Sequence, residues 1–224
     1  MPKVSDYYTK RPRIARIGSK LSLRARERVY SDFINIMKPH QNTKIVDVGV
    51  TCDETNQEGN FLEIHYPWPE NLMAAGVEGQ SSFLGKRNIA YVRIVSHKPL
   101  PFPDKHFDIG YSNAVLEHVG SRLKQRAFLR EVCRISKRIF VVVPNRLFPI
   151  EHHTGLPLLH YLPNNIFRWF LQVIGQEFYS KEENLNLFFP REYLSMFPSD
   201  IGVKIKFSGV GIGLLSSNIS AFTQ

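Results

Sequence analysis

Cysteine and long apolar runs are both scarce in this sequence. Cys52 and Cys133 are the only cysteines among 224 residues, too few for a disulfide framework or a four-cysteine zinc site. No uninterrupted apolar run approaches the roughly 18–20 residues that cross a bilayer. The first twenty residues also lack the apolar centre of a signal peptide. These absences predict a cytoplasmic protein with reduced thiols.

Acidic residues are few at the N-terminus, and this imbalance accounts for most of the net charge of +9. Residues 1–30 contain nine lysines and arginines but only Asp6 and Glu27, a net charge of +7, whereas the rest of the chain carries +2. A basic arm over residues 1–20 can contact phosphate on RNA, on an anionic lipid or on a sugar nucleotide. It can equally be a solvated arm that leads into the charged face of a helix.

The remaining composition, 43% hydrophobic and 22% charged, is that of an ordinary globular protein, and we expect one domain over residues 21–224. Five short apolar runs predict strands, at 44–48, 71–78, 91–95, 106–114 and 138–145. Helical spacing of apolar residues falls between them, most clearly at 19–37 and 122–136. This alternation predicts a doubly wound, mostly parallel α/β sheet, which an antiparallel hairpin of 203–212 and 216–224 completes.

Ligands of such a sheet bind beyond the carboxyl ends of the strands. Candidate residues lie at that point of all five predicted strands. The candidates are Asp47, Gly49, Thr51, Glu78, Ser96, His97, Ser112, Asn113 and Asn145. Each residue alone is explained by a turn or a strand end, but the recurrence at successive strands predicts a shared binding site.

The segment PLPFPDKHFDIGYSNAVLEHVG, with KIVDVGVT, AAGVE and RIFVVVPNRLFPIEHHT, resembles the class I methyltransferases. The first of these segments resembles the small-molecule (type 11) family related to quinone-biosynthesis enzymes. The resemblance implies a Rossmann-like fold and S-adenosyl-L-methionine as the cofactor. The sequence differs from the family pattern after Gly49, where Val50, Thr51 and Cys52 stand in place of the further glycines that the family usually has.

The resemblance also implies a role for each strand end. Asp47, Gly49 and the nearby Thr51 would hold the methionyl part of the donor, and Glu78 would bond the ribose hydroxyls. Ser96 and His97 would border the adenine. Asn113 and the turn toward Glu117 and His118 would line the floor near the sulfonium, although this acid and histidine could instead cap the following helix.

Residues 146–175 fit neither the strand nor the helix pattern, because prolines interrupt them as far as Pro163. A loop of this length is usually functional, and we interpret it as a substrate lid. Its candidates for a general base are Glu151, His152, His153 and His160. The same residues could simply hold the loop in place. A metal site is not expected, because adjacent histidines do not easily reach one ion and no cysteine or aspartate lies nearby.

The acceptor is expected to be a small or lipid-like molecule methylated on oxygen or nitrogen. Apolar residues over 156–174 favour such a molecule, with the basic arm at an anionic membrane surface, but they could also form core or a homodimer contact. Two alternatives stay open. An RNA methyltransferase would explain the charge, although no separate RNA-binding module is evident, so nucleic acid is not the favoured partner. A non-catalytic binding protein would explain the missing glycines.

Overall fold

Seven strands form a single sheet in the residues that the computed structural model describes, namely 19–51, 59–79 and 82–224. Their order is β3-β2-β1-β4-β5-β7-β6. The parallel strands are β1 (Ile45–Val48), β2 (Leu72–Gly76), β3 (Ala90–Arg93), β4 (Phe107–Asn113) and β5 (Ser136–Pro144). The last two, β6 (Lys204–Ser208) and β7 (Asn218–Phe222), are antiparallel and complete the sheet beside β5.

The central strands are apolar because they lie inside the sheet, with a strand on each side and helices over both faces. Ile109 of β4 lies between Ile45 of β1 and Arg138 of β5, and Val142 of β5 lies between Asn113 and Ser220. Strands covered on both faces cannot alternate polar and apolar residues, so runs such as Val141–Val143 are required there. The predicted doubly wound sheet with a C-terminal antiparallel hairpin is confirmed.

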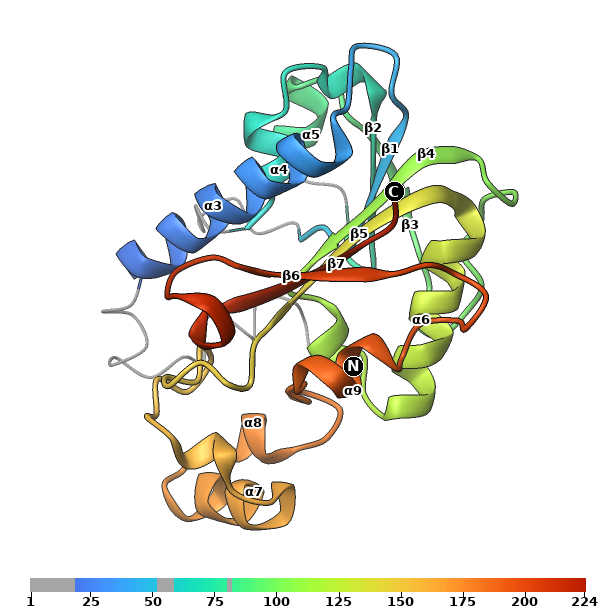
Figure 1. Ribbon diagram of the computed structural model, residues 1–224. Coiled ribbons are helices and arrows are strands. Elements are labelled where there is room, and N and C mark those ends of the chain that lie inside the picture. The colour runs from blue at the N-terminus through green and yellow to red at the C-terminus, as the bar shows by residue number, and fades with distance from the viewer. Residues whose placement is uncertain (1–18, 52–58, 80–81) are drawn as a thin grey trace.

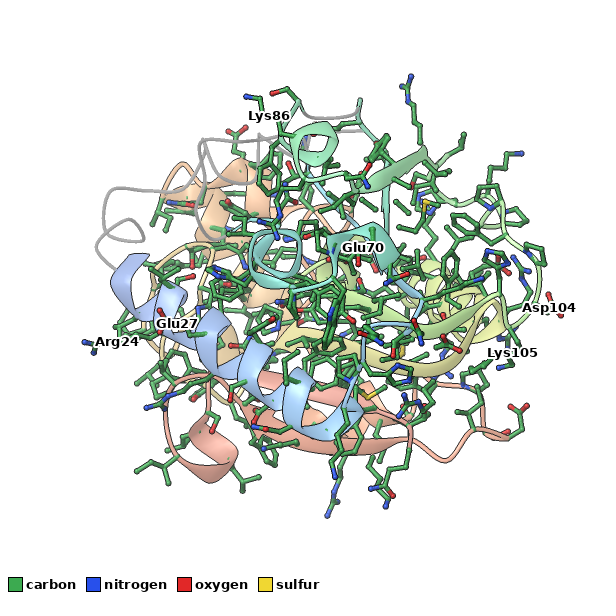
Figure 2. All side chains as sticks on the ribbon, turned by 90° about the horizontal axis from the view of Figure 1, so that it is seen from above. Arg24, Glu27, Glu70, Lys86, Asp104 and Lys105 are labelled. Carbon is green, nitrogen blue, oxygen red and sulfur yellow. The ribbon has the colours of Figure 1, made fainter. Side chains whose placement is uncertain are left out.

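Helices cover both faces of the sheet (Figure 1). The first layer contains α3 (Ser19–Met37), α4 (Phe61–His65) and α5 (Ser82–Lys86), and the second contains α6 (Arg122–Ile135) and α9 (Pro190–Leu194). In α3, the side chains of Val29, Phe33 and Met37 lie one turn apart and are buried against the sheet. The outer face of α3 is charged, and Figure 2 shows Arg24 and Glu27 pointing away from the protein.

A small lobe lies below the sheet in Figure 1, made by α7 (Asn164–Val173) and α8 (Glu177–Ser180). It has its own apolar cluster, in which Phe167, Leu171 and Tyr179 are buried with Leu185 and Leu187. Short 3-10 turns lie at Pro69–Asn71, Leu116–His118, Leu159–Tyr161 and Gly213–Leu215. None of the described helices is both long enough and apolar enough to pass through a bilayer.

Candidate active site

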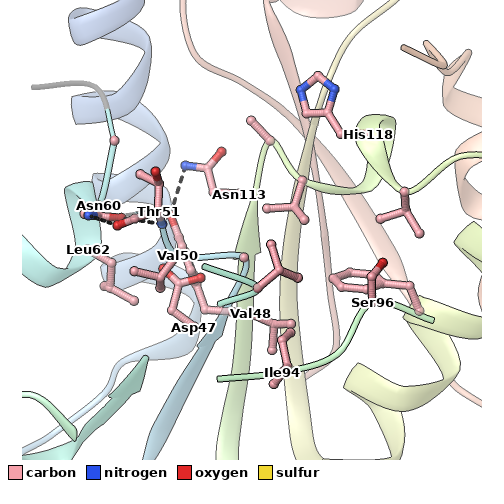
Figure 3. A pocket seen from close by; sticks show the side chains of 18 of the residues that line it. Asp47, Val48, Val50, Thr51, Asn60, Leu62, Ile94, Ser96, Asn113 and His118 are labelled. Atoms are coloured by element: carbon pink, nitrogen blue, oxygen red, sulfur yellow. Dashed lines mark hydrogen bonds between the residues drawn. The ribbon is translucent and has the colours of Figure 1, made fainter. Parts of the chain in front are cut away.

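A cavity of about 530 Å³ opens at the carboxyl ends of the parallel strands, a volume suited to a small-molecule ligand. Seven of the predicted site residues line it: Asp47, Gly49, Thr51, Ser96, His97, Asn113 and His153. Much of the wall is apolar, and Figure 3 shows Val48, Val50, Leu62 and Ile94 around it. The predicted residues therefore converge from β1, β4 and three separate loops on one space.

The turn after β1 comes very close to the turn after β4. Gly49 has a φ of +116°, and a Cβ built on it would lie 2.2 Å from a methyl carbon of Val115. The Gly49 amide donates to the carbonyl of Ala75 in β2 at 2.8 Å. A glycine is required here because any side chain would meet Val115 and would also strain the backbone.

The side chain of Asn60 pairs with the backbone of Thr51, nine residues earlier in the chain. The Asn60 side chain accepts from the Thr51 amide at 3.1 Å and donates to the Thr51 carbonyl at 2.8 Å (Figure 3). Asn60 itself has a φ of 52°, a left-handed conformation that asparagine tolerates better than most residues. The sequence analysis did not single out this residue. Cys52 lies outside the described residues.

Asp47 and Glu63 form a buried acidic pair beside the cavity. Burial and the charge of Glu63 raise the pKa of Asp47 well above its usual value, although Arg26 opposes this rise. Burial also raises the pKa of Glu63 to about 7. Only Asp47 and Arg26 of this group line the cavity. The pair therefore retains a proton to a higher pH than an isolated carboxylic acid does.

Asn113 ends β4 with an unsatisfied acceptor. Its side-chain nitrogen donates to the Tyr111 hydroxyl at 3.1 Å, but its oxygen Oδ1 is buried and has no partner among the described residues. The neighbouring Ser112 hydroxyl donates to the Val48 carbonyl at 2.7 Å, which ties β4 to the end of β1. A buried acceptor of this kind is a natural position for a ligand N–H group.

Ser96 and His97 lie in the loop after β3 and form one side of the cavity. His97 has a φ of 62°, and burial together with Lys124 lowers its pKa. Glu78 does not line the cavity, although its neighbour Val77 does. Tyr91 fixes the backbone there, because its hydroxyl donates to the carbonyls of Gly76 and Glu78.

The far end of the cavity contains a connected row of acidic and imidazole groups. Glu151 is buried and accepts from His153 Nδ1 at 2.8 Å and from the amides of His153 and Thr154 at 3.0 and 2.6 Å. Burial alone would raise the pKa of Glu151, but the charge and hydrogen bonds of His153 and the Thr154 bond outweigh it and hold this pKa well below its usual range. Beyond it, His153 Nε2 lies 3.1 Å from His118 Nε2.

His118 is fixed from the opposite side by the segment before α9. Its Nδ1 atom lies 2.6 Å from the carbonyl of Asn184, and the Asn186 amide donates to the Glu117 carbonyl at 2.8 Å. The Asn186 side chain adds a bond to the carbonyl of Gly120 at 2.7 Å. Residues 116–120 are therefore tied to residues 184–186, which follow the α7–α8 lobe directly.

Glu117 is the most deeply buried acid of this group. Its side chain is 0% exposed, and neither carboxylate oxygen has a hydrogen-bond partner among the described residues. Burial raises its pKa to about 7, although the charge of His153 opposes the rise. The resemblance placed Glu117 and His118 at the floor or in a helix cap. In the structure His118 lines the cavity and Glu117 lies directly behind it.

Two predicted histidines lie apart from the cavity lining. His152 Nε2 is 3.2 Å from the Ser217 carbonyl, and the ring stacks on Phe148. His160 is buried, with Nε2 at 2.9 Å from the Phe148 carbonyl. Among the described residues, none from 156–174 lines the cavity. The substrate lid and the roles of His152 and His160 as bases therefore remain predictions, and the position of these residues does not support them. Of the predicted loop candidates, only His153 with Glu151 behind it reaches the site.

Part of the chain matches a known protein family. Residues 67–139 match a family described as a methyltransferase domain, which covers β2 to the start of β5. That stretch includes Ser96, His97 and Asn113. No curated protein matches the sequence.

Solved structures share the fold at low sequence identity. A SAM-dependent methyltransferase of Thermotoga maritima, described as a possible histamine N-methyltransferase, is 16% identical with a TM-score of 0.51, over 89% of this chain and 90% of that one. A SAM-dependent methyltransferase of Mesorhizobium loti is 14% identical with a TM-score of 0.53, over 88% and 98%. PigF with SAH is 15% identical with a TM-score of 0.54, over 94% and 65%.

The fold is thus that of the Rossmann-like methyltransferases. Together with the family match, it supports a class I methyltransferase that uses S-adenosylmethionine, as the sequence predicts.

Proposed function

We propose that this protein transfers the methyl group of S-adenosylmethionine to an oxygen or nitrogen atom of a small or lipid-like acceptor. The observation that supports it most is one continuous cavity that joins Asp47, Ser96, His97 and Asn113 at the strand ends to His118 and His153 at the far end. The Leu100–Val119 segment further supports a relationship to the small-molecule enzymes of quinone biosynthesis.

The donor occupies the strand-end side of the cavity in this proposal. Its methionyl group lies against Asp47 and Gly49, where the close approach of the backbone leaves room for no side chain. Its adenine lies by Ser96 and His97, and its ribose hydroxyls bond Glu78, which follows the lining residue Val77 in the chain. The ammonium and sulfonium charges favour the ionised form of the Asp47–Glu63 pair.

The acceptor occupies the side of His118 and His153. Methyl transfer from a sulfonium needs mainly in-line placement, because the donor is already a strong electrophile, and orientation can lower the barrier by several kcal/mol, at most about 7–11. The acceptor atom must also lose a proton, and an imidazole near it can take this proton. Glu151 acts through His153 as a positioning residue, because it fixes the ring by the bond to Nδ1.

The donor assignment is tested by calorimetry with S-adenosylmethionine. We expect the wild-type chain to bind it and the Glu78→Ala variant to bind it about 10- to 100-fold more weakly, since a charge-assisted bond pair is lost. Glu70→Ala, which removes an exposed acid from the turn before β2, is the matched control and should bind normally.

Unchanged affinity in Glu78→Ala would contradict the ribose assignment. No detectable heat from the wild-type chain at millimolar donor would contradict the enzyme itself and favour a non-catalytic binding protein. Salt-sensitive binding of RNA would favour an RNA acceptor instead.

A lipid-like acceptor is supported by an exposed apolar stripe on α7. Ile166, Trp169 and Val173 lie on one helical face and are 44%, 60% and 63% exposed. Such a face can enter a membrane interface, and the basic arm can strengthen binding to anionic lipid. The protein would then be peripheral to the membrane on its cytoplasmic side.

We expect the full chain to sediment with anionic vesicles and Trp169→Glu to reduce this binding at least 10-fold. Leu123→Glu is the matched control, because Leu123 is a 79% exposed apolar residue on α6. If both variants bound the vesicles equally, or if the wild-type chain did not bind them, the acceptor would not be presented by a membrane. A water-soluble acceptor would then be favoured.

A further inference from the structure

The two histidines of the cavity floor, His118 and His153, face each other with their Nε2 atoms. The Nε2 atoms of His118 and His153 lie 3.1 Å apart, and their rings are perpendicular with centroids 4.8 Å apart. They come from different elements, the turn after β4 and the loop after β5. Whatever lies between them is therefore shared by two separately anchored side chains.

The other ring nitrogen of each histidine has a fixed role. His153 Nδ1 is 2.8 Å from Glu151, whose carboxylate already accepts two backbone amides, so Nδ1 must donate. His118 Nδ1 is 2.6 Å from the Asn184 carbonyl, which can only accept. In neutral rings both Nε2 atoms therefore carry lone pairs, and two lone pairs at 3.1 Å repel unless a cation lies between or beside them.

Glu117 supplies a negative charge at the same point. Its Oε1 atom lies 3.8 Å from His118 Nε2, and the three candidate ligand atoms of Glu117, His118 and His153 all lie within 4.8 Å of one another. The carboxylate is fully buried without a hydrogen-bond donor, and no lysine or arginine of the described ranges forms an ion pair with it. A buried carboxylate without a partner is costly, and either a proton or a neighbouring positive ion removes this cost.

We propose that Glu117, His118 and His153 bind one divalent transition-metal ion. Two imidazole nitrogens on a zinc ion, at about 2.0–2.1 Å each, lie about 2.9 Å apart at a right angle and about 3.4 Å apart at the tetrahedral angle. The observed 3.1 Å falls between these values. Two histidines and one carboxylate suit zinc, iron(II), cobalt(II) or manganese(II), and they leave positions open toward the cavity.

The groups behind the ligands match those that support metal-bound histidines elsewhere. A ligating histidine usually donates its other N–H to a carboxylate or a backbone carbonyl, which fixes the tautomer and orients the ring. Here His153 donates to the Glu151 carboxylate and His118 to the Asn184 carbonyl. The formal charges also suit a divalent ion, because ionised Glu117 and Glu151 contribute two negative charges and a histidine that binds a metal is neutral.

This inference departs from the expectation of no metal, which considered only the histidines of one loop. Binding of the ion stands on the geometry alone, whereas its role in the reaction rests on the proposed function. In that role the acceptor atom meets the ion at an open position, and coordination favours loss of its proton. With the ion bound, the histidine nitrogens are its ligands, so the acceptor's proton passes to water in the open cavity; the imidazole serves as the base only in the metal-free protein.

The test is a titration of the full chain after treatment with a chelator. We expect calorimetry with Zn²⁺ to show one bound ion per chain and Co²⁺ to give the visible absorption of a low-coordinate site. Glu117→Gln and His118→Gln should each weaken binding at least 10-fold, and Glu151→Gln should weaken it about 10- to 100-fold through His153. His106→Gln is the control, because this exposed histidine lies just before the amino end of β4, whereas the cavity opens at the carboxyl ends of the strands. Thermal unfolding of each variant reports whether it has folded.

Several results would overturn the proposal. They are the absence of one-to-one binding by the wild-type chain, full affinity in folded Glu117→Gln and His118→Gln variants, or an equal loss in His106→Gln. A proton shared between the Nε2 atoms, seen by nitrogen NMR in protein that takes up no Zn²⁺, would overturn it as well. S-adenosylmethionine is titrated into the same samples. Donor binding without metal binding counts against the metal site alone, and metal binding without donor binding counts against the proposed function alone.

Discussion

Gly49→Ala is expected to abolish measurable binding of S-adenosylmethionine and to destabilise the protein by about 2 kcal/mol or more. The added Cβ would lie 2.2 Å from a methyl carbon of Val115 and 2.9 Å from another, so one of the two turns must move. The φ of +116° adds backbone strain that only glycine avoids. Both turns line the cavity, and the displacement therefore changes the donor site as well as the stability. Calorimetry and chemical denaturation measure the two effects.

Gly85→Ala is the matched control for this substitution. Gly85 lies at an exposed position of α5, and a Cβ there would meet no atom within 4 Å. Alanine should stabilise that helix by about 0.5–1 kcal/mol and leave donor binding unchanged. Wild-type affinity in Gly49→Ala would show that the turn after β1 does not contact the donor.

Glu63→Gln is expected to stabilise the protein above neutral pH and to flatten the dependence of stability on pH. Burial raises the pKa of Glu63 from its ordinary 4.5 to about 7, so the folded state holds a proton that the unfolded state has released. Folding stability therefore falls as pH rises from about 4.5 to about 7, by at most about 3 kcal/mol from this group. Glutamine keeps the shape and removes the charge, and it also relieves Asp47 of a neighbouring negative charge.

Denaturation of both proteins at pH 5.5 and pH 8 measures this effect. The wild-type chain should lose stability between the two pH values, and Glu63→Gln should lose less, because the remaining loss comes from other buried acids such as Glu117, whose pKa is also raised to about 7. Glu27→Gln, on the exposed face of α3, is the control and should follow the wild-type profile. A wild-type profile in Glu63→Gln would mean that Glu63 is ionised in the folded protein at both pH values.

The sequence carried much of the information about the fold because the pattern of the central strands has a simple physical cause. A strand such as β5 must be apolar on both faces when helices cover both, so Val141–Val143 already indicated a parallel sheet. The rule that ligands bind at the carboxyl ends of parallel strands then selected Asp47 and Asn113, and both line the cavity.

The floor of the site was harder to predict because it depends on contacts between distant residues. His118 and His153 are 35 positions apart, and no local pattern shows that their Nε2 atoms meet. Asn60 is a similar case, because its contribution comes from two hydrogen bonds to Thr51, which lies nine positions earlier in the chain. Prolines correctly indicated an irregular segment before α7, but they carried no information on where the lobe would pack.

The attachment of the cavity floor to the stretch after α8 links two parts of the molecule mechanically. Asn184 and Asn186 hold the turn of Glu117 and His118, and the neighbouring Leu185 and Leu187 are buried within the α7–α8 lobe. One short run of backbone thus serves both as the anchor of the lobe and as the wall behind the histidines. A substitution that displaces residues 184–187 is therefore expected to disturb the packing of the lobe and the position of His118 together.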